Sequence, residues 1–459
     1  MKFMRFSIIF IFIIFLTACT QMPFGDGLFY IKGQYVDVAK GHDNNDEQLN
    51  EEKSGVNPEN EYVEKDDDET YIEEDYMDES NEYNENQDID NIDTEEDIEE
   101  PVLIQEFNTQ LPDNIGLQLK YEEYPISYDY LLILKSSNIR ELPSSKSKII
   151  GKRGAMEKIR LVSEVRGEYL KTWDKDSWYE VQWEEDGNNE TGYIFSALAE
   201  DRHFQFDKMD KSIDQLQQSL DFGLLAHISN YKNANGVPPK IRGKTFDSYG
   251  HRRSQSAAGY EEPDKSSEFR YIPDGMLLHV LEEQEGFTKV KVVGFEGEYW
   301  VLNKYINREK VLTNLNKVVI VDRKYQNQGV FELEDGRWNL ISYGFSTTGK
   351  TGKYSLETPL GFYTFIEKRD RFYYFEDGTT KIAGYAPYAA RFSGGGYIHG
   401  VPANYKMEGD KIIDPGKQEY LHSIGTIPKS HMCIRNYTSH AKFLHSWIDI
   451  GETAIVIIE

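Results

Sequence analysis

The sequence predicts a mainly β protein made of several units: an acidic N-terminal segment, two small β-barrels with a helix between them, and a C-terminal β-sandwich. Three observations lead to this prediction. From residue 126 onward, short apolar runs alternate with turn residues, which is typical of strands in barrels and sandwiches. Residues 207–235 instead carry apolar side chains at helical spacing. Acidic residues are concentrated before residue 101.

The first residues have the pattern of an export signal. Lys2 and Arg5 precede an apolar run, Ile8–Leu16, that is too short to span a membrane. The adjoining Leu16-Thr17-Ala18-Cys19 resembles a bacterial lipobox, so we expect residues 1–18 to be a signal peptide and Cys19 to carry lipid. An accidental cysteine after a plain signal is the alternative. The resemblance implies a cell-envelope protein anchored by acyl chains on the extracytoplasmic or periplasmic side of a membrane. Because Thr20 is not an aspartate, we expect the outer membrane if the cell has two.

The next segment holds nearly all of the net charge. Of the −28 total, −25 lies between His42 and Glu100, where 27 acidic residues face only Lys53 and Lys65. Such a segment buries too little apolar surface to offset its ordering entropy, so residues 19–110 are predicted to be a disordered acidic linker. A stalk that carries the rest of the chain away from the membrane is the preferred interpretation, and an acidic binding tail is the alternative. No basic patch indicates a nucleic-acid partner.

Residues 126–202 read as a first small barrel. Its predicted strands are Tyr130–Leu134, Lys158–Val162 and Trp178–Trp183. Three further segments, 138–143, 149–151 and 192–194, resemble a bacterial SH3 domain. Modules of that class commonly bind cell-wall peptides, so wall binding and a purely structural spacer are both open.

A helical segment and a second, diverged barrel follow. Residues 207–235 are predicted to be a helical linker that ends at Gly236-Val237-Pro238-Pro239. Its apolar face consists of Ile213, Leu216, Leu220, Leu224, Leu225 and Ile228. Residues 241–308 then repeat features of the first unit, which indicates a second SH3-like domain. In particular, 274–281 parallels 154–162, and 297–301 parallels 192–194.

Residues 311–459 are predicted to form the sandwich. Val318–Asp322 reads as a buried strand, and Gly329–Leu333 followed by Asp335-Gly336 reads as the first half of a hairpin. Repeated strands with Gly and Asp turns favour an all-β sandwich or barrel.

Cys433 is the chemical focus of this part of the chain. The sequence has two cysteines, and the other, Cys19, lies in the export signal, so no internal disulfide is available to Cys433. A nearby imidazole can activate a thiol by stabilising thiolate or by accepting its proton. A lone cysteine with histidines elsewhere in the sequence is therefore a candidate nucleophile, with an ordinary buried cysteine as the alternative.

Three motifs around Cys433 resemble one family. Ser430-His431-Met432-Cys433-Ile434-Arg435 resembles the Ser-His-Gly-Cys-Ile-Arg signature of the L,D-transpeptidase (YkuD) catalytic domain. Ile398-His399-Gly400 resembles its upstream Ile-His-Gly, and residues 358–364 resemble its Thr-Pro-x-Gly-x-Phe-Thr strand. The resemblance implies a β-sandwich with the cysteine beneath a flap, to which Tyr373, Tyr374 and Phe375 are candidates.

The resemblance also implies the reaction. The family's cysteine attacks a carbonyl of a tetrapeptide stem of peptidoglycan, expels D-alanine and passes the acyl group from a thioester to an amine, which forms a cross-link or attaches an envelope protein. Carried over by residue, Cys433 is the nucleophile, His399 the general base and Gly400 the residue whose carbonyl orients that base. His431 is expected to help shape the oxyanion site. Substrate binding is expected of Arg435, Ser430, Tyr397 and Asn436, with a structural ion pair as the alternative for Arg435.

Two departures from the family pattern affect the expected site. Met432 stands where the family has glycine, so a positive φ or a close approach there would strain the backbone. The 32 positions from His399 to His431 exceed the family's interval, which indicates an insertion around 407–410 and 417–419 that enlarges an active-site loop.

Several alternatives stay open. A zinc site is the rival for His399, His422, His431, His440, His445 and Cys433, but the spacing is not that of usual zinc ligands, and we predict neither a metal nor a cofactor. An L,D-carboxypeptidase or amidase on the same scaffold would use water in place of the amine. A catalytically inactive, wall-binding lipoprotein is the third class. The expected partners are stem peptides, a membrane through the lipid, and an envelope protein if that is the acyl acceptor.

Overall fold

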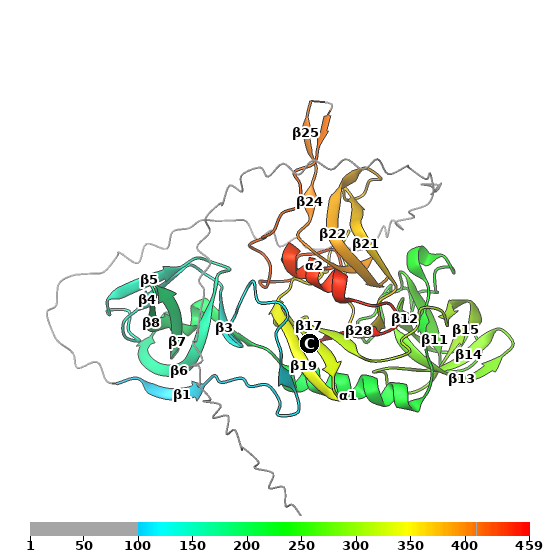
Figure 1. The fold of residues 1–459 in the computed structure, drawn as a ribbon, viewed down its shortest axis with the longest axis horizontal. Helices are drawn as coiled ribbons and strands as arrows, with labels where there is room; N and C mark the ends of the chain where they lie inside the picture. The colour runs from blue at the N-terminus through cyan, green and yellow to red at the C-terminus, as the bar shows by residue number, and fades with distance from the viewer. Residues whose placement is uncertain (1–99, 410) are drawn as a thin grey trace, which may run out of the picture.

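The computed structural model describes residues 100–409 and 411–459. The predicted signal peptide, the lipidation site at Cys19 and most of the acidic segment lie outside these residues. Two small β-units flank a central part, one at the left and one at the right of Figure 1. Among the described residues, no helix is long and apolar enough to cross a membrane.

The first unit is a single antiparallel sheet with the strand order β5-β4-β8-β7-β6-β3-β9. An additional strand, β1, pairs with β6 at Val102↔Arg166. The predicted linker of residues 19–110 therefore ends too late, because its last residues contribute a strand to this sheet. The strands are β1 (Val102–Glu106), β3 (Asp129–Ile133), β4 (Ser137–Arg140), β5 (Ile149–Arg153), β6 (Lys158–Leu170), β7 (Lys175–Glu185), β8 (Asn188–Phe195) and β9 (Ala199–His203), with a 3-10 turn at Ser196–Leu198.

The second unit has the corresponding strand order, β12-β11-β15-β14-β13-β10-β16. Every strand on this path has a counterpart at the same place in the path of the first unit, which supports the predicted duplication. Assignment of either unit to the SH3 class stays a prediction. The strands are β10 (Leu225–Ile228), β11 (Ser256–Tyr260), β12 (Phe269–Pro273), β13 (Leu277–Gln284), β14 (Phe287–Val292), β15 (Tyr299–Leu302) and β16 (Ile306–Asn307), with 3-10 turns at Tyr231–Asn233 and Asn303–Tyr305.

The helix between the units is shorter than the sequence predicts. Helix α1 (Phe206–Phe222) ends at Gly223, whose φ of 156° departs from helical geometry. Leu225 and Ile228, which continue the helical spacing, are instead buried in β10. The second unit therefore begins at β10 and not at residue 241. The helix prediction failed here because a buried strand can carry apolar residues at positions that also fit the buried face of a helix.

The central part is a β-sandwich. Its first sheet has the order β2-β19-β18-β17-β28-β20, in which β17 pairs in parallel with β28. The hairpin turn between β18 and β19 lies at Asp335-Gly336, as the sequence predicts. The strands are β2 (Gly116–Leu117), β17 (Lys317–Asp322), β18 (Asn327–Glu334), β19 (Arg337–Phe345), β20 (Gly361–Thr364) and β28 (Thr453–Ile458).

The second sheet of the sandwich has the order β21-β22-β23-β27, and β24 also pairs with β22. Helix α2 (Thr438–Trp447) follows β27 directly and packs against β22 and β23. The strands are β21 (Glu367–Phe375), β22 (Ile382–Ser393), β23 (Gly396–His399), β24 (Ala403–Asn404) and β27 (Ile434–Arg435). A separate hairpin, β25 (Lys406–Glu408) with β26 (Lys411–Ile413), projects from the top of the molecule in Figure 1.

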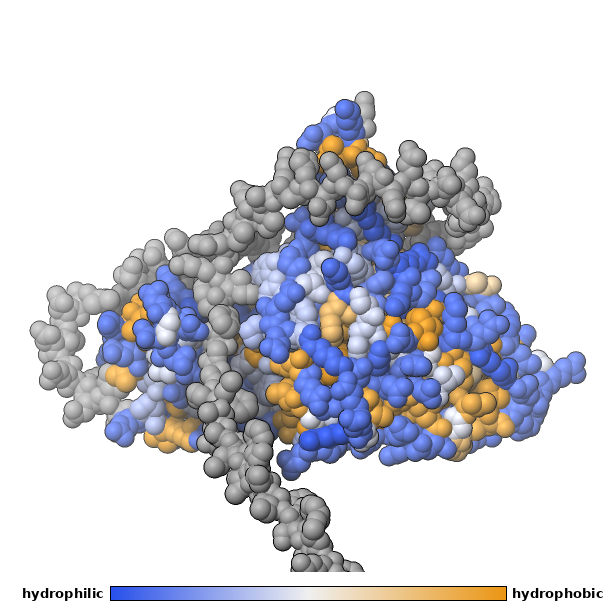
Figure 2. Space-filling view, viewed as in Figure 1, coloured by the Kyte–Doolittle hydropathy of each residue, from blue (hydrophilic) through white to orange (hydrophobic). Residues whose placement is uncertain are grey.

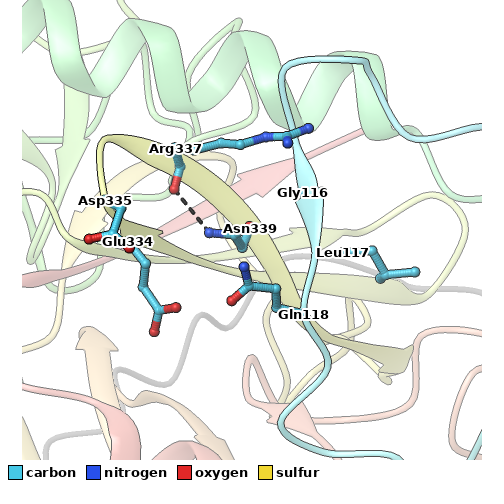
Figure 3. A pocket seen from close by; sticks show the side chains of 7 residues that line it. All are labelled: Gly116, Leu117, Gln118, Glu334, Asp335, Arg337 and Asn339. Atoms are coloured by element: carbon cyan, nitrogen blue, oxygen red, sulfur yellow. Dashed lines mark hydrogen bonds between the residues drawn. The ribbon is translucent and has the colours of Figure 1, made fainter. Parts of the chain in front are cut away.

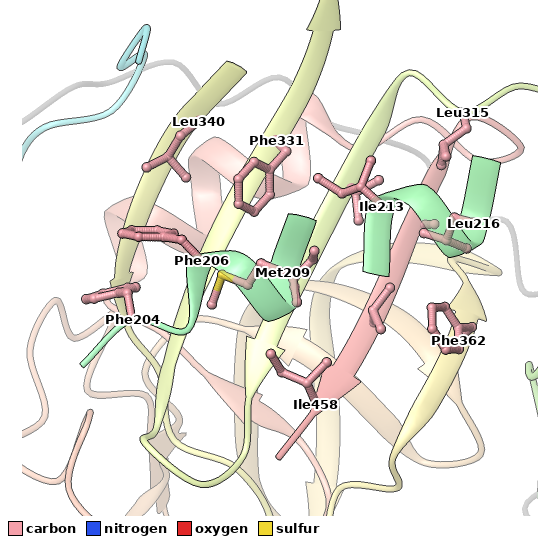
Figure 4. Close-up of a cluster of buried hydrophobic side chains, with 14 of the residues drawn as sticks. Phe204, Phe206, Met209, Ile213, Leu216, Leu315, Phe331, Leu340, Phe362 and Ile458 are labelled. Atoms are coloured by element: carbon pink, nitrogen blue, oxygen red, sulfur yellow. The ribbon is translucent and has the colours of Figure 1, made fainter. Parts of the chain in front are cut away.

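The first sheet of the sandwich is buried on both faces, so its strands read as continuous apolar runs. Alternate residues of β17 therefore belong to different cores. Val318 and Ile320 join the core that also contains α1, and Val319 and Val321 join the core shared with the second sheet and the second unit. Figure 4 shows the α1 side chains directed at the sheet, among them Met209 and Ile213 near Phe331. Helix α1 is thus a packing helix rather than a free linker.

Candidate active site

The parallel pairing of β23 with β27 brings the predicted site residues together. Ile398 pairs with Ile434, and both side chains are buried in the core between the sheets. Because strand side chains alternate between faces, the flanking residues of both strands point to the opposite face. That face presents Tyr397, His399, Cys433 and Arg435. His399 lies beside Arg435, and Cys433 immediately precedes β27.

Cys433 is almost fully enclosed. Its side chain packs with Ala389, Tyr397 and Phe372, and 7% of the residue is exposed. The thiol donates to the main-chain carbonyl of Gly395, 3.5 Å away. Burial raises the pKa of Cys433, because the thiolate is poorly solvated there, while the Tyr397 backbone and the Arg435 charge favour the thiolate and oppose the increase. At neutral pH the resting group is therefore a thiol.

His399 is held in one orientation. Its Nδ1 lies 2.6 Å from the carbonyl oxygen of Gly400, and 3% of the residue is exposed. Since a carbonyl oxygen can only accept, Nδ1 carries the proton and Nε2 is left with a free lone pair. Burial lowers the pKa of His399 to about 4, with the Gly400 hydrogen bond opposing this and the Arg435 charge adding to it. The imidazole is therefore neutral and can accept a proton at physiological pH.

Arg435 has a charge without a carboxylate partner among the residues that the structure describes. Its backbone is fixed by hydrogen bonds in both directions with Thr347. Its side chain is partly buried, and its Nε has no hydrogen-bond partner in the described part of the chain. Burial lowers the pKa of Arg435, because the charged guanidinium is less well solvated inside the protein than in water. Within residues 100–409 and 411–459, the alternative of a structural ion pair for Arg435 therefore finds no partner.

Ser430 and Asn436 support the site from within rather than facing an open surface. Ser430 donates from its hydroxyl to the carbonyl of Cys433 and is 1% exposed. The N–H of Asn436 donates to the carbonyl of His399 at 2.9 Å, and its side-chain oxygen accepts from Gln328. Both residues therefore fix the backbone around Cys433 and His399.

Tyr397 lies directly opposite Cys433 and is part of a polar chain. Its ring stacks on Phe372 with 4.2 Å between centroids, and its hydroxyl donates to Glu367 at 2.6 Å. Burial raises the pKa of Tyr397 strongly, so the hydroxyl stays protonated and remains a donor. Glu367 in turn accepts from Arg391 at 3.2 Å.

His431 does not join this group. Its side chain is 49% exposed, and its Nε2 lies 3.0 Å from a carboxylate oxygen of Asp377. Asp377 belongs to the turn of the β21–β22 hairpin, so the pair ties the tip of that hairpin to the loop before Cys433. The three flap candidates Tyr373, Tyr374 and Phe375 lie on β21 of the same hairpin. A direct contribution of the His431 side chain to an oxyanion site finds no support in this arrangement.

Met432 adopts the backbone conformation that favours glycine. Its φ is 100°, within the left-handed half of the conformational map where side chains are strained. Two neighbours hold it there: the Thr358 hydroxyl donates to the Met432 carbonyl at 2.8 Å, and Gly349 donates to that hydroxyl at 2.8 Å. Thr358, which the sequence places in a strand motif, thus restrains the loop that leads to Cys433.

The insertion predicted after His399 takes two forms. Its first part is the projecting β25–β26 hairpin, on which Met407 and Ile412 are exposed apolar residues (Figure 2). Its second part packs on the sandwich, where Glu419 accepts from the N–H of Ser439 at the start of α2. Asp414 pairs with Arg371 of β21 at 3.1 Å, so the insertion contacts the hairpin that bears the flap candidates.

Among the histidines of the rival zinc hypothesis, His440 has a structural role. His440 is buried on α2, with Nε2 2.8 Å from the hydroxyl of Ser342, and burial lowers its pKa to about 3. Within residues 100–409 and 411–459, no group of three potential metal ligands gathers.

A hollow of about 370 Å³ beside β2 and the β18–β19 turn contains none of the predicted site residues (Figure 3). It is lined by Gly116, Leu117, Gln118, Glu334, Asp335, Arg337 and Asn339.

The site combines groups of the kind that nucleophilic acyl transfer requires. They are an enclosed thiol, a neutral imidazole with one fixed tautomer, and a guanidinium without a carboxylate partner among the described residues. Three of its supporting groups, Glu367, Gly395 and Asp377, were missed by the sequence analysis. Nothing local in the sequence indicates them, since each acts across the fold on a residue more than 25 positions away.

No curated protein matches the chain. A solved L,D-transpeptidase from Mycobacterium smegmatis is 16% identical with a TM-score of 0.25, over 44% of this chain and 78% of that one. One from Mycobacterium tuberculosis H37Rv is 16% identical with a TM-score of 0.24, over 44% and 77%.

Another solved structure is a fused Zn-dependent amidase/peptidase/peptidoglycan-binding domain-containing protein from Clostridium acetobutylicum. It is 18% identical with a TM-score of 0.21, over 31% of this chain and 51% of that one. The matched region thus spans about half of the Clostridium chain, and likeness at these TM-scores says nothing about a reaction. The family match is more specific: residues 316–458, which hold the sandwich and the whole cysteine site, match the YkuD L,D-transpeptidase catalytic domain.

Proposed function

We propose that this protein is a peptidoglycan L,D-transpeptidase that uses Cys433 as its nucleophile. The observation that carries the proposal is the shared face of β23 and β27, on which Cys433, His399 and Arg435 lie together. The family match over residues 316–458 supports the same reaction class.

In the proposed reaction, the Cys433 sulfur attacks the carbonyl carbon that precedes the terminal D-alanine of a tetrapeptide stem. His399 Nε2 takes the thiol proton and then gives it to the departing D-alanine amine. The acyl group remains as a thioester on Cys433. An amine of a second stem peptide attacks this thioester, loses a proton to His399 and leaves with the acyl group, while the thiol is restored.

Main-chain groups and Arg435 complete the proposed roles. The Gly400 carbonyl keeps Nδ1 protonated, so Nε2 stays the basic atom. The guanidinium of Arg435 binds a carboxylate of the stem, a role supported by its Nε, which has no hydrogen-bond partner among the described residues. Membrane attachment through Cys19 and wall binding by the two β-units remain predictions that fit this function.

The test uses the full-length protein, wild type and Cys433→Ala, with a disaccharide-tetrapeptide substrate and mass spectrometry of the products. We expect a cross-linked dimer that has lost one alanine, and we expect it to be absent with the variant. A tripeptide without dimer would show that water is the acceptor and would replace the transpeptidase by a carboxypeptidase. Product formation that survives Cys433→Ala would refute the assigned nucleophile.

A further inference from the structure

The second β-unit contacts the sandwich through a buried carboxylate. Asp274 lies in the turn between β12 and β13 and is 2% exposed. Its Oδ1 accepts from the N–H of Asn230, 2.6 Å away in the same unit. Its Oδ2 accepts from the guanidinium of Arg391 at 2.8 Å and from the N–H of Gly394 at 2.9 Å. Both of these donors belong to the sandwich.

The first route from Asp274 to the thiol is short. Gly394 begins the turn that joins β22 to β23, and the carbonyl of its neighbour Gly395 accepts from the thiol of Cys433. The interface has no spare room at this point: a Cβ at Gly275 would lie 1.8 Å from the carbonyl oxygen of Phe392. A carboxylate that fixes the Gly394 amide therefore also fixes the carbonyl against which the thiol rests.

The second route runs through side chains. Arg391 is 7% exposed and reaches from Asp274 to Glu367, whose carboxylate lies 3.2 Å from its Nε. Glu367 accepts the hydroxyl of Tyr397, and Tyr397 packs against Cys433. Since truncating one partner of a buried ion pair leaves the other charge uncompensated, loss of Asp274 would release Arg391 and everything that it orients.

Because both routes end at the same thiol, we propose that Asp274 is a positioning residue for Cys433 and that the second β-unit is a constituent of the active site. The inference rests on the proposed function only in taking Cys433 as the reactive thiol. It assigns the second unit a role that neither wall binding nor spacing requires. The unit is expected to keep the Gly394–Gly396 turn closed over the nucleophile.

The experiment compares Asp274→Asn with wild type in the full-length protein, solubilised in detergent. The rate of Cys433 alkylation by iodoacetamide is followed from pH 6 to pH 10 by mass spectrometry of the Cys433 peptide, which separates it from Cys19. Turnover of the disaccharide-tetrapeptide gives kcat and KM. Thermal unfolding shows whether each variant is folded.

Asp247→Asn is the matched control. Asp247 is a buried carboxylate of the same unit, 6% exposed, and it accepts the backbone N–H groups of Tyr249, His251 and Tyr271. All of its hydrogen-bond partners lie within the second unit. It therefore reports what a weakened unit does to the site while the hydrogen bonds from Asp274 to the sandwich stay intact. Its tie to the sandwich is indirect, through His251, whose Nε2 lies 3.4 Å from the carbonyl oxygen of Leu360.

We expect opposite changes in the two activities of Asp274→Asn. A released turn exposes the thiol, so alkylation at pH 7 should rise at least about threefold, and the pH profile should shift to lower pH. A displaced thiol is poorly aligned for its substrate, so kcat should fall roughly tenfold or more while KM changes little. Asp247→Asn should lower the melting temperature and leave the alkylation profile unchanged.

Two results would overturn the proposal. One is a folded Asp274→Asn protein with the wild-type alkylation profile, and the other is an equal shift in Asp247→Asn. If Asp274→Asn fails to fold, Arg391→Lys is the deciding variant. Lysine keeps the buried positive charge, but it has one ammonium group, whereas two nitrogens of Arg391 contact Asp274 and Glu367. An unchanged profile in that variant would refute the proposal. The alkylation measurement needs no turnover, so failure of the proposed function is recognised separately.

Discussion

At the residue scale, the loop before Cys433 combines an unfavourable backbone conformation with strong local restraint. Met432 has a φ of 100°, and its carbonyl is held by Thr358 while the next carbonyl is held by Ser430. Strain of this kind persists only where surrounding contacts over-determine the conformation. The contacts here fix the peptide groups on both sides of Cys433, the proposed nucleophile.

The strain at Met432 can be measured with two substitutions. Met432→Ala and Met432→Gly both remove the buried side chain, but only glycine adopts this φ without steric cost. We expect the glycine variant to be the more stable of the two by about 1 kcal/mol in urea unfolding. An alanine variant that equals or exceeds the glycine variant in stability would show that the backbone is not strained here.

The buried histidine of α2 predicts a pH dependence of stability. Burial lowers the pKa of His440 from 6.5 to about 3. Between these values the unfolded chain binds a proton that the folded chain does not, so stability is lost as the pH falls through this window, at about 1.4 kcal/mol per unit of pKa difference. Urea midpoints from pH 7 to pH 4 should therefore fall more steeply for wild type than for His440→Gln. Parallel curves would contradict a neutral His440 in the folded state.

At the element scale, the segment between β24 and β27 is held by parts of the chain far from it in sequence. Lys158 of the first unit donates to the carbonyl of Ile424 at 2.7 Å, and burial lowers the pKa of Lys158 to about 8. Arg202 of the same unit donates to the carbonyl of Thr426. The segment so anchored leads directly into the Ser430–Arg435 motif. The first unit therefore supports the site from one side as the second unit does from the other.

The start of α2 is stabilised by a residue of the insertion. Glu419 accepts the N–H of Ser439 at 3.0 Å and its hydroxyl at 2.6 Å. A carboxylate at a helix N-terminus satisfies a free N–H group and interacts favourably with the helix dipole. Glu419→Ala should lower the free energy of unfolding by about 1 kcal/mol, and Glu419→Gln by less. Chemical denaturation of both variants tests this, and equal stability of Glu419→Ala and wild type would remove the capping role.

At the scale of the whole molecule, two hydrophobic cores are shared between the sandwich and the flanking units, in addition to the first unit's own core. One core contains Tyr130 of the first unit, Met209 of α1 and Phe331 of the sandwich. The other contains Ile228 and Leu278 of the second unit with Ile455 of the sandwich. The segment between β1 and β3 also contributes, since Tyr121 stacks on His440 with 4.5 Å between ring centroids. The described part of the chain is therefore one packed body rather than domains on flexible links.

Shared cores predict cooperative unfolding. A fragment of residues 311–459 would expose the sheet face that α1 covers, and we expect it to be insoluble or to bind a hydrophobic dye. The full chain should show one calorimetric transition, because loss of either unit opens a core of the sandwich. Separate transitions, or a folded 311–459 fragment with the stability of the full chain, would contradict this expectation.

Much of the fold follows from local pattern. The runs Val318–Asp322 and Trp178–Trp183 became strands, and Asp335-Gly336 became a hairpin turn, because period, β-propensity and turn chemistry agree there. The helix prediction failed beyond Phe222 because Leu225 and Ile228 fit a helix face as well as a strand. The family's glycine at position 432 raised the question of whether Met432 has a positive φ, and the structure has one there.

The sequence by itself determined the chemical groups of the site: one thiol in the described part of the chain, and the histidine and arginine of its motifs. Only the tertiary structure decided how these groups are held. His431 turned to Asp377, Arg435 was left without a carboxylate partner in the described residues, and Asp274 came to rest against the turn that touches Cys433. The physical reason is that residue type and local period are written in neighbouring positions. Burial and ion pairing, in contrast, depend on contacts between residues far apart in the sequence: 54 positions separate His431 from Asp377, and 117 separate Asp274 from Arg391.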